Sequence, residues 1–219
     1  EFAVSFLGCL YAGVLAVPTI TPRTSRHLQA VHAVAGDARP SVVLTTTALY
    51  EKLGTAASDR SLASVPWLTV DAGATAEAAA WRPPALEARS LAFLQYTSGS
   101  TATPKGVMVT HGNLMANHRH LAACLDQSED TTIVGWLPLF HDMGLIGHLL
   151  QAIFLGSTSV LMPPEAFLVK PVRWLRAIAR YQGRQNAAPT FALRLCTDRV
   201  TDAERSDLDL SSWERVCVG

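Results

Sequence analysis

One stretch of the sequence places hydroxyls, glycines and a cation at a spacing that suits an anionic ligand. Residues 97–106 read Thr-Ser-Gly-Ser-Thr-Ala-Thr-Pro-Lys-Gly, between the apolar run 93–96 and the β-branched run 107–110. Such a loop can present backbone N–H groups, hydroxyls and the ammonium of Lys105 to one point. Polyphosphate oxygens are dense, anionic acceptors for these donors. The stretch therefore predicts a phosphate-binding loop between two buried strands.

Two other kinds of loop share part of this composition. An ordinary polar turn is possible, because Ser, Thr, Gly and Pro are common turn residues. A simple hairpin connection needs only two to five residues, whereas about eight intervene here. The Walker phosphate loop is excluded by spacing: counted from Gly99, its second glycine position holds Pro104 and its Ser/Thr position holds Gly106.

The loop resembles the signature of the adenylate-forming enzymes, the superfamily of acyl-CoA synthetases, luciferases and nonribosomal peptide adenylation domains. Residues 96–106 match ten of the eleven positions of that signature, counting its free position. The departure is Ala102, where the superfamily usually has glycine. Glycine permits a positive φ and close backbone approach, and alanine resists both. We expect Ala102 to affect the rate of the reaction more than the assignment of the chain to this superfamily.

A second candidate for chemistry is His141, in the segment Pro-Leu-Phe-His-Asp-Met-Gly-Leu that spans 138–145. This segment directly follows an apolar strand pattern, and ligands of parallel α/β sheets bind outside the carboxyl ends of the strands. Taken alone, His141 and Asp142 could equally cap the helix that follows. The adenylate-forming enzymes carry an aromatic-His-x-x-Gly element here, beside the acyl carboxylate. Within the superfamily, segments 6–13, 93–96, 135–147 and 209–213 resemble the fatty acyl-AMP ligases.

The resemblance implies that the parent protein activates a fatty acid with ATP and Mg²⁺, releasing pyrophosphate and leaving an acyl-adenylate. It makes His141 and Lys105 the catalytic residues, with His141 donating to an acyl or phosphate oxygen. It implies that the β- and γ-phosphates are held by Thr97, Ser98, Gly99, Ser100, Thr101, Thr103, Lys105 and Gly106.

The implied acceptor of the acyl group is the phosphopantetheine arm of an acyl carrier protein. An acyl-CoA synthetase and a catalytically silent nucleotide- or acyl-binding module stay open as alternatives. The resemblance covers the whole chain, so residues 1–219 are expected to form part of an N-terminal AMP-binding domain. The C-terminal domain is expected beyond Gly219, and this stretch alone is expected to be inactive.

Composition narrows the class further. The sequence has 18 Lys and Arg against 18 Asp and Glu, which argues against a nucleic-acid partner, since such binding depends on phosphate neutralisation. The four cysteines are widely spaced and form no C-x-x-C pair, so free thiols in the cytoplasm are expected. Two apolar stretches, 3–17 and 143–162, are too short or too polar for a transmembrane segment.

The remaining pattern predicts an α/β fold with mostly parallel sheets covered by helices on both faces, because helical stretches alternate with short, continuously apolar strands. Helices are expected over 2–16, 25–35, 48–57, 112–125, 145–155, 171–181 and 189–199, the second ending at Gly36. Strands are expected over 14–20, 41–46, 67–70, 93–96, 107–110, 133–137, 159–162 and 184–188, and a surface connection over 71–90.

Two further residue sets have modest signals. His111, His118 and His120 do not form a convincing metal set, because residues two apart point to different faces of a helix, and we expect surface histidines. A set of apolar side chains could line an acyl tunnel, although packing in the core is the favoured interpretation: Trp136, Met143, Leu145, Phe167 and Phe191.

Overall fold

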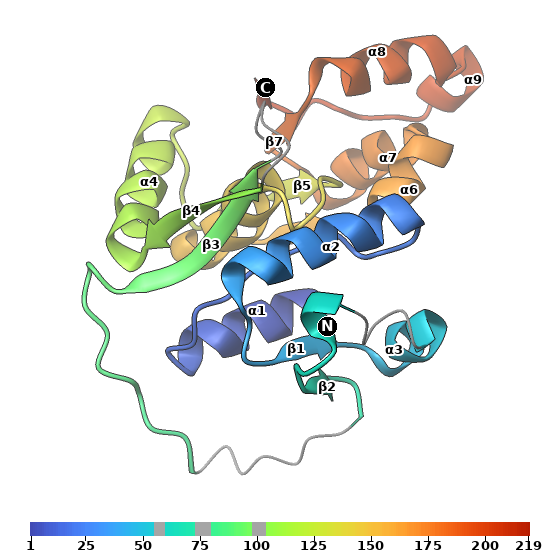
Figure 1. The fold of residues 1–219 in the computed structure, drawn as a ribbon. Coiled ribbons are helices and arrows are strands. Elements are labelled where there is room, and N and C mark those ends of the chain that lie inside the picture. Colours follow the sequence, from blue (N-terminus) through green and yellow to red (C-terminus); the bar gives the residue numbers. More distant parts are fainter. Residues whose placement is uncertain (55–59, 73–79, 98–103) are drawn as a thin grey trace. The chain divides into compact units, whose positions relative to one another are not determined.

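The computed structural model describes residues 1–54, 60–72, 80–97 and 104–219. The chain forms two compact units, Glu1–Asn113 and Leu114–Gly219, and each is described by itself. The elements of the first unit are α1 (Phe2–Tyr11), α2 (Ser25–Ala38), β1 (Val43–Thr45), α3 (Thr47–Leu53), the 3-10 turn η2 (Arg60–Leu62), β2 (Trp67–Thr69), β3 (Leu91–Thr97) and β4 (Lys105–Thr110), followed by the start of α4 (His111–Cys124) (Figure 1).

The first unit contains two pairs of strands. β1 lies parallel to β2, and β3 pairs with β4 in the antiparallel sense. Helix α1 covers β3, because the ring of Phe6 meets the fully buried ring of Phe93 edge-on at 5.5 Å. The hydroxyl-rich loop thus leaves the sheet at the end of a strand anchored by aromatic packing.

Two boundaries in this unit differ from the sequence prediction. The first helix ends at Tyr11, and the strand expected over 14–20 is reduced to a parallel bridge between Ala16 and Phe93. Helix α2 begins as predicted, with the Thr24 hydroxyl accepting from the His27 N–H at 3.2 Å. It continues past Gly36 and ends where Arg39 adopts a left-handed φ of 47°. A glycine within a helix costs only about 1 kcal/mol, which the surrounding turns offset.

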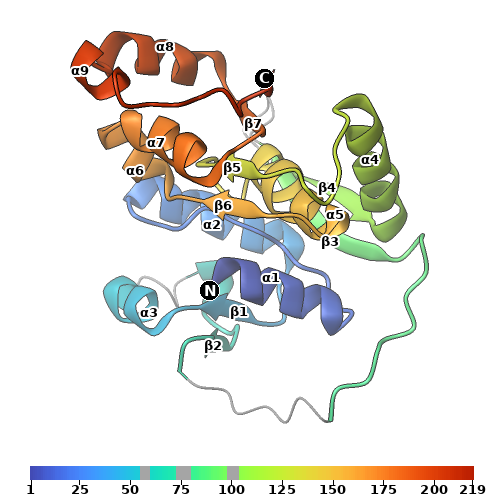
Figure 2. The ribbon, with the colours of Figure 1, turned by 180° about the vertical axis from the view of Figure 1, so that it is seen from behind.

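The second unit is a parallel sheet with helices. Its elements after α4 are β5 (Ile133–Gly135), the π-helix η4 (Met143–Leu150), α5 (Gln151–Leu155), β6 (Ser159–Leu161), α6 (Pro164–Val169), α7 (Val172–Tyr181), β7 (Gln185–Ala188), α8 (Thr190–Arg199), α9 (Asp202–Arg205) and β8 (Arg215–Val218) (Figure 2). The strand order is β6-β5-β7-β8, and every pairing in this sheet is parallel. The predicted mostly parallel α/β fold is confirmed.

Both faces of this sheet are covered, as two neighbouring residues of β5 show. Successive residues of a strand face opposite sides. Val134 belongs to the buried cluster that includes Trp174 of α7, whose indole N–H donates to the Val134 carbonyl at 3.1 Å. A Cβ placed on Gly135 would lie 2.0 Å from Nδ1 of His148 in η4. Helix α7 therefore covers one face of β5 and η4 the other.

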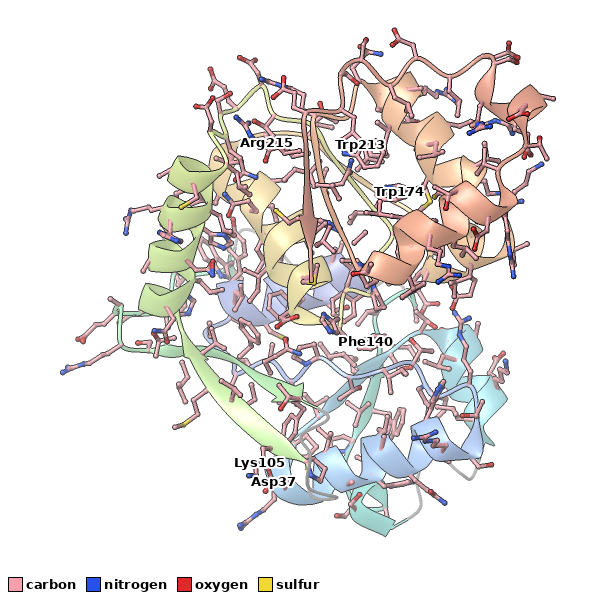
Figure 3. The ribbon with its side chains drawn as sticks, turned by 90° about the horizontal axis from the view of Figure 1, so that it is seen from above. Asp37, Lys105, Phe140, Trp174, Trp213 and Arg215 are labelled. Carbon is pink, nitrogen blue, oxygen red and sulfur yellow. The ribbon has the colours of Figure 1, made fainter. Side chains whose placement is uncertain are left out.

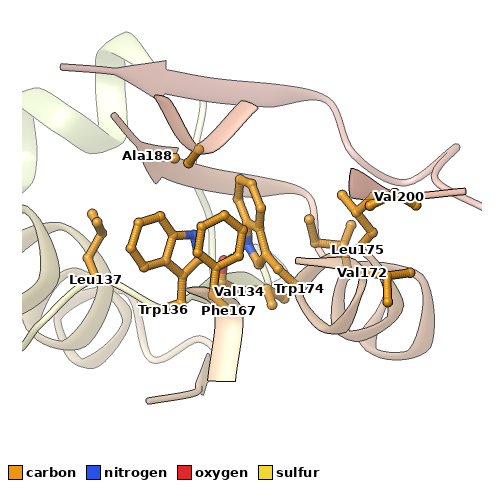
Figure 4. Packing of buried hydrophobic residues seen from close by; sticks show 11 residues of the cluster. Val134, Trp136, Leu137, Phe167, Val172, Trp174, Leu175, Ala188 and Val200 are labelled. Atoms are coloured by element: carbon orange, nitrogen blue, oxygen red, sulfur yellow. The ribbon is translucent and has the colours of Figure 1, made fainter. Parts of the chain in front are cut away.

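The core on the α7 face is aromatic (Figure 4). The rings of Trp136 and Phe167 stack with centroids 4.1 Å apart, and Trp174 meets Phe167 edge-on at 5.6 Å. Trp136, Phe167 and Leu145 are buried, as the favoured core interpretation predicts. Phe191 departs from it, because 53% of its surface is exposed.

Two other expectations for this unit are wrong in part. The apolar stretch 145–155 is not one α-helix: η4 has π geometry from Met143 and becomes α-helical only at Gln151. The spacing of apolar residues does not reveal a change from π-helical to α-helical geometry. His118 is buried rather than on the surface, and its Nδ1 lies 2.5 Å from Oε1 of Gln151. The neighbouring helix α5 covers it, with Phe154 stacked on the imidazole at 5.4 Å.

Within the described ranges, no helix combines the length and the apolar character needed to cross a bilayer. The four cysteines are free thiols.

Candidate active site

The base of the predicted phosphate loop is an antiparallel strand pair. Thr97, the last residue of β3, pairs with Lys105, the first residue of β4, and Tyr96 pairs with Gly106. Both Thr97 and Lys105 are exposed (Figure 3 labels Lys105). The structure therefore brings a hydroxyl and an ammonium together where the loop begins and ends. The other predicted phosphate-binding residues lie outside the described residues, as does Ala102: Ser98, Gly99, Ser100, Thr101 and Thr103.

The glycine at the base of the loop is required by the ring that lies over it. A Cβ placed on Gly106 would lie 2.9 Å from Cζ of Tyr96, closer than real Cβ atoms approach. The Tyr96 hydroxyl donates to Oδ2 of Asp37, on α2, at 2.5 Å. Burial, together with the hydrogen bond to Asp37 and the charge of Asp37, raises the pKa of Tyr96 to about 12. Sequence reasoning missed Asp37, because no local spacing connects it to the loop.

The expectation that both flanking strands are buried is wrong for β4. Phe93 of β3 is fully buried, whereas Val107 and Met108 of β4 are 51% and 67% exposed. A β-branched run predicts a strand but does not by itself reveal whether another element covers it.

His141 lies in the second unit, at the predicted corner between β5 and the helix η4. Its Nδ1 lies 2.7 Å from Oδ1 of Asp142, and more than half of each side chain is exposed. The same Asp142 oxygen accepts from the Met143 N–H at 2.7 Å, so Asp142 caps η4. The cap interpretation is confirmed for both residues, because Nδ1 of His141 also accepts from the Met143 N–H, at 3.3 Å. More than half of the His141 side chain is nevertheless exposed.

The glycine three residues after His141 allows the backbone segments of this corner to approach each other closely. A Cβ on Gly144 would lie 2.2 Å from the Pro138 carbonyl oxygen. The His141 N–H donates to that same oxygen at 3.1 Å, and the His141 carbonyl accepts from the Leu145 N–H at 2.8 Å. The backbone of His141 is therefore fixed on both sides, and π-helical turns of this kind are frequent at functional sites.

Beneath this corner, two side chains replace strand-to-strand hydrogen bonds. β5 and β7 pair at Ile133 and Gln185. Beyond that pair, the Val134 N–H donates to Oδ1 of Asn186 at 3.1 Å, and the Ala187 N–H donates to Nε2 of His148 at 3.2 Å. Burial lowers the pKa of His148 to about 4. A neutral, buried imidazole thus takes part in the hydrogen bonding of the strands that precede and neighbour the His141 corner. The sequence pattern does not reveal this role of His148.

The first unit also contains a cavity of about 560 Å³. Its walls come from α1, α2, α3, η2, β1, β2 and the segment between the first two helices, and they include neither Thr97 nor Lys105. The cavity is therefore separate from the base of the phosphate loop.

The two described donors at the base of the loop, Thr97 and Lys105, suit a polyphosphate. No group of three or more His, Cys, Asp or Glu side chains suited to a metal ion occurs among the residues that the structure describes. Mg²⁺ commonly binds through substrate phosphates, waters and one or two protein oxygens, and the Thr97 hydroxyl beside Lys105 suits that arrangement.

The parallel α/β sheet, together with the sequence signatures of residues 96–106 and of the His141 segment, is typical of the adenylate-forming class. The family model described as "AMP-binding enzyme" matches residues 1–219. The chain belongs to the family of AMP-binding enzymes.

Similar proteins include the medium-chain-fatty-acid–[acyl-carrier-protein] ligase JamA of Moorena producens, which is 39% identical over 100% of this chain and 38% of its own length. The long-chain-fatty-acid–AMP ligase FadD32 of Mycobacterium marinum is 40% identical over 100% of this chain and 36% of its own length. The chain thus spans less than two fifths of these relatives.

Among solved structures, a fatty acyl-adenylate ligase from L. pneumophila in complex with acyl adenylate and pyrophosphate superposes with a TM-score of 0.91. It is 35% identical, and the match covers 98% of this chain and 37% of that chain.

Proposed function

We propose that the protein containing this chain activates a fatty acid with ATP, forming an acyl-adenylate and releasing pyrophosphate. The pairing of Thr97 with Lys105 at the mouth of a hydroxyl-rich loop is the observation that carries this proposal. The likeness to a ligase that holds acyl adenylate and pyrophosphate supports it. Residues 1–219 then form part of an N-terminal AMP-binding domain.

In this reaction the protein mainly positions the reactants and stabilises charge, because its side chains form no covalent bond with the transferred group. The fatty carboxylate attacks the α-phosphorus, and pyrophosphate leaves. Lys105 neutralises charge on the departing oxygens. The β- and γ-phosphates are held by Thr97, Ser98, Gly99, Ser100, Thr101, Thr103, Lys105 and Gly106. Mg²⁺ bound with ATP supplies further neutralisation of the phosphates.

His141 is the second proposed catalytic residue. Its backbone is fixed by two hydrogen bonds and its side chain is exposed, so the imidazole can donate to a carboxylate or phosphate oxygen. Losing one donor of this kind costs on the order of 10²-fold in rate.

The proposed acceptor of the acyl group is the phosphopantetheine arm of an acyl carrier protein. The name of JamA, an acyl-carrier-protein ligase, supports this carrier protein as the acceptor. Coenzyme A is the second candidate, because a putative fatty-acid–CoA ligase, fadD21, is 40% identical over the whole chain. A silent binding module is the third, motivated by Ala102. The free thiols support a cytoplasmic location, since reduced cysteines persist there.

The test is fatty-acid-dependent exchange between ATP and pyrophosphate, measured in the full-length protein. His141→Ala should reduce exchange by about 10²-fold. His120→Ala, on the exposed side of α4, is the matched control and should leave exchange unchanged. Full exchange in His141→Ala removes His141 from the mechanism, and MgATP binding without any exchange in the unsubstituted protein favours the silent module.

The acceptor is settled by offering each candidate in turn. Acyl transfer to a phosphopantetheinylated carrier protein, with no thioester formed on coenzyme A, is the expected result.

A further inference from the structure

Tyr96 and Asp37 form a connection between helix α2 and the base of the phosphate loop. The two residues are 59 positions apart in the sequence, and the phenol donates to the carboxylate at 2.5 Å. Asp37 lies on α2 and Lys105 at the start of β4 (Figure 3). All of these residues belong to the first unit.

The position of Asp37 is unfavourable for the helix that carries it. α2 ends at Ala38, so Asp37 lies in the last turn. The C-terminal end of a helix carries partial negative charge, and a carboxylate there is destabilising by about the amount that a cation stabilises. A residue that violates a local rule is commonly retained for a role elsewhere, and the contact that Asp37 makes is with Tyr96.

The Tyr96 ring transmits this contact to the second strand. The ring lies over Gly106 so closely that a Cβ there would come within 2.9 Å of it. Tyr96 and Gly106 are also register partners, one residue away from the pair formed by Thr97 and Lys105. The hydrogen bond to Asp37 therefore restrains the Tyr96 ring. The ring in turn restrains the end of β3 and the start of β4, between which the loop runs.

We propose that Asp37 and Tyr96 are positioning residues that hold the base of the phosphate-binding loop in the geometry that MgATP and pyrophosphate require. The inference rests on the proposed adenylating function. Asp37 acts through Tyr96, and Tyr96 acts through the backbone of Thr97 and Gly106. Neither side chain needs to touch the nucleotide.

This role predicts a particular kinetic signature. The connection holds the loop in the ground state and in the transition state alike, so its loss weakens phosphate binding uniformly and raises KM with little change in kcat. The KM values for MgATP and for pyrophosphate should rise together, and the KM for the fatty acid should not change.

The experiment compares Tyr96→Phe, Asp37→Ala and Asp37→Asn in the full-length protein. Tyr96→Phe keeps the ring over Gly106 and removes only the donor; it should raise KM for MgATP by about tenfold, the usual effect of a hydrogen bond to a charged group. Asp37→Ala should do the same. Asp37→Asn keeps an oxygen acceptor and should restore KM to within about threefold of the original value.

A double variant and a control sharpen the result. Because both side chains act through one bond, Tyr96→Phe with Asp37→Ala should raise KM no more than either single change. Tyr50→Phe, on α3 with its ring against Trp67, removes a phenol elsewhere in the same unit and should leave all three KM values unchanged.

The outcomes separate this inference from the proposed function. Exchange in the unsubstituted protein together with unchanged MgATP and pyrophosphate KM values in Tyr96→Phe would overturn the inference alone. Should the unsubstituted protein bind MgATP without exchange, its dissociation constant replaces KM: a tenfold rise in Tyr96→Phe supports the inference, and no rise overturns it. Absence of both exchange and MgATP binding would overturn both proposals.

Discussion

His148 should make the protein sensitive to acid, and the structure gives the size of the effect. The imidazole is almost completely buried, and Nε2 accepts from the Ala187 N–H at 3.2 Å. Protonating Nε2 would place a charge in an apolar site and turn this acceptor into a second donor facing the Ala187 N–H. Burial accordingly lowers the pKa from 6.5 to about 4.

The sign of the effect follows from this lowered pKa. The folded protein favours neutral His148, so the stabilisation is fully present above about pH 6.5 and is lost as the pH falls toward 4. At about 1.36 kcal/mol for each unit of pKa shift, the full loss is roughly 3 kcal/mol. Roughly 2 kcal/mol is already lost at pH 5.

The assay is denaturant unfolding of the unsubstituted protein and of His148→Gln at several values between pH 7.5 and pH 4.5. Glutamine retains an acceptor for the Ala187 N–H but does not titrate. The unfolding free energy of the unsubstituted protein should fall more steeply with falling pH than that of His148→Gln. Relative to the variant, the unsubstituted protein should lose roughly 2 kcal/mol between pH 7.5 and pH 5. His120→Gln is the control and should follow the unsubstituted protein throughout. Parallel pH profiles for His148→Gln and the unsubstituted protein would refute the reasoning.

Three further substitutions have defined outcomes. Gly135→Ala places a Cβ 2.0 Å from Nδ1 of His148, so it should lower the unfolding free energy by about 1–3 kcal/mol or more in a denaturant titration. Trp174→Phe removes a fully buried indole and leaves the Val134 carbonyl without its donor; the expected loss is about 2 kcal/mol, seen as a lower unfolding midpoint with an unchanged slope. Lys105→Ala should reduce ATP–pyrophosphate exchange by at least about 10²-fold without shifting the unfolding midpoint, and a large shift in that midpoint would mean that Lys105 is structural.

The strands and helices that were predicted well are those whose signals are local. The start of α2 at Ser25 and the helix α7 follow from neighbouring residues, and both are present. The prediction of a strand over 14–20 was wrong because pairing, not apolar content, defines a strand. Among the residues that the structure describes, Ala16 alone in this stretch pairs with another strand. The burial of His118 was missed for a related reason: Gln151 and Phe154, which enclose it, come from another part of the chain.

For the candidate site, the sequence alone predicted the chemistry. The hydroxyls, Lys105 and the segment around His141 are contiguous, so their spacing could be compared directly with a family signature. Only the tertiary structure showed which distant residues contact the elements that carry these groups. Asp37 reaches Tyr96 across 59 positions, and His148 reaches Ala187 across 39. Such pairs are set by how the chain folds back on itself and excludes water, and no short-range pattern of residues encodes that.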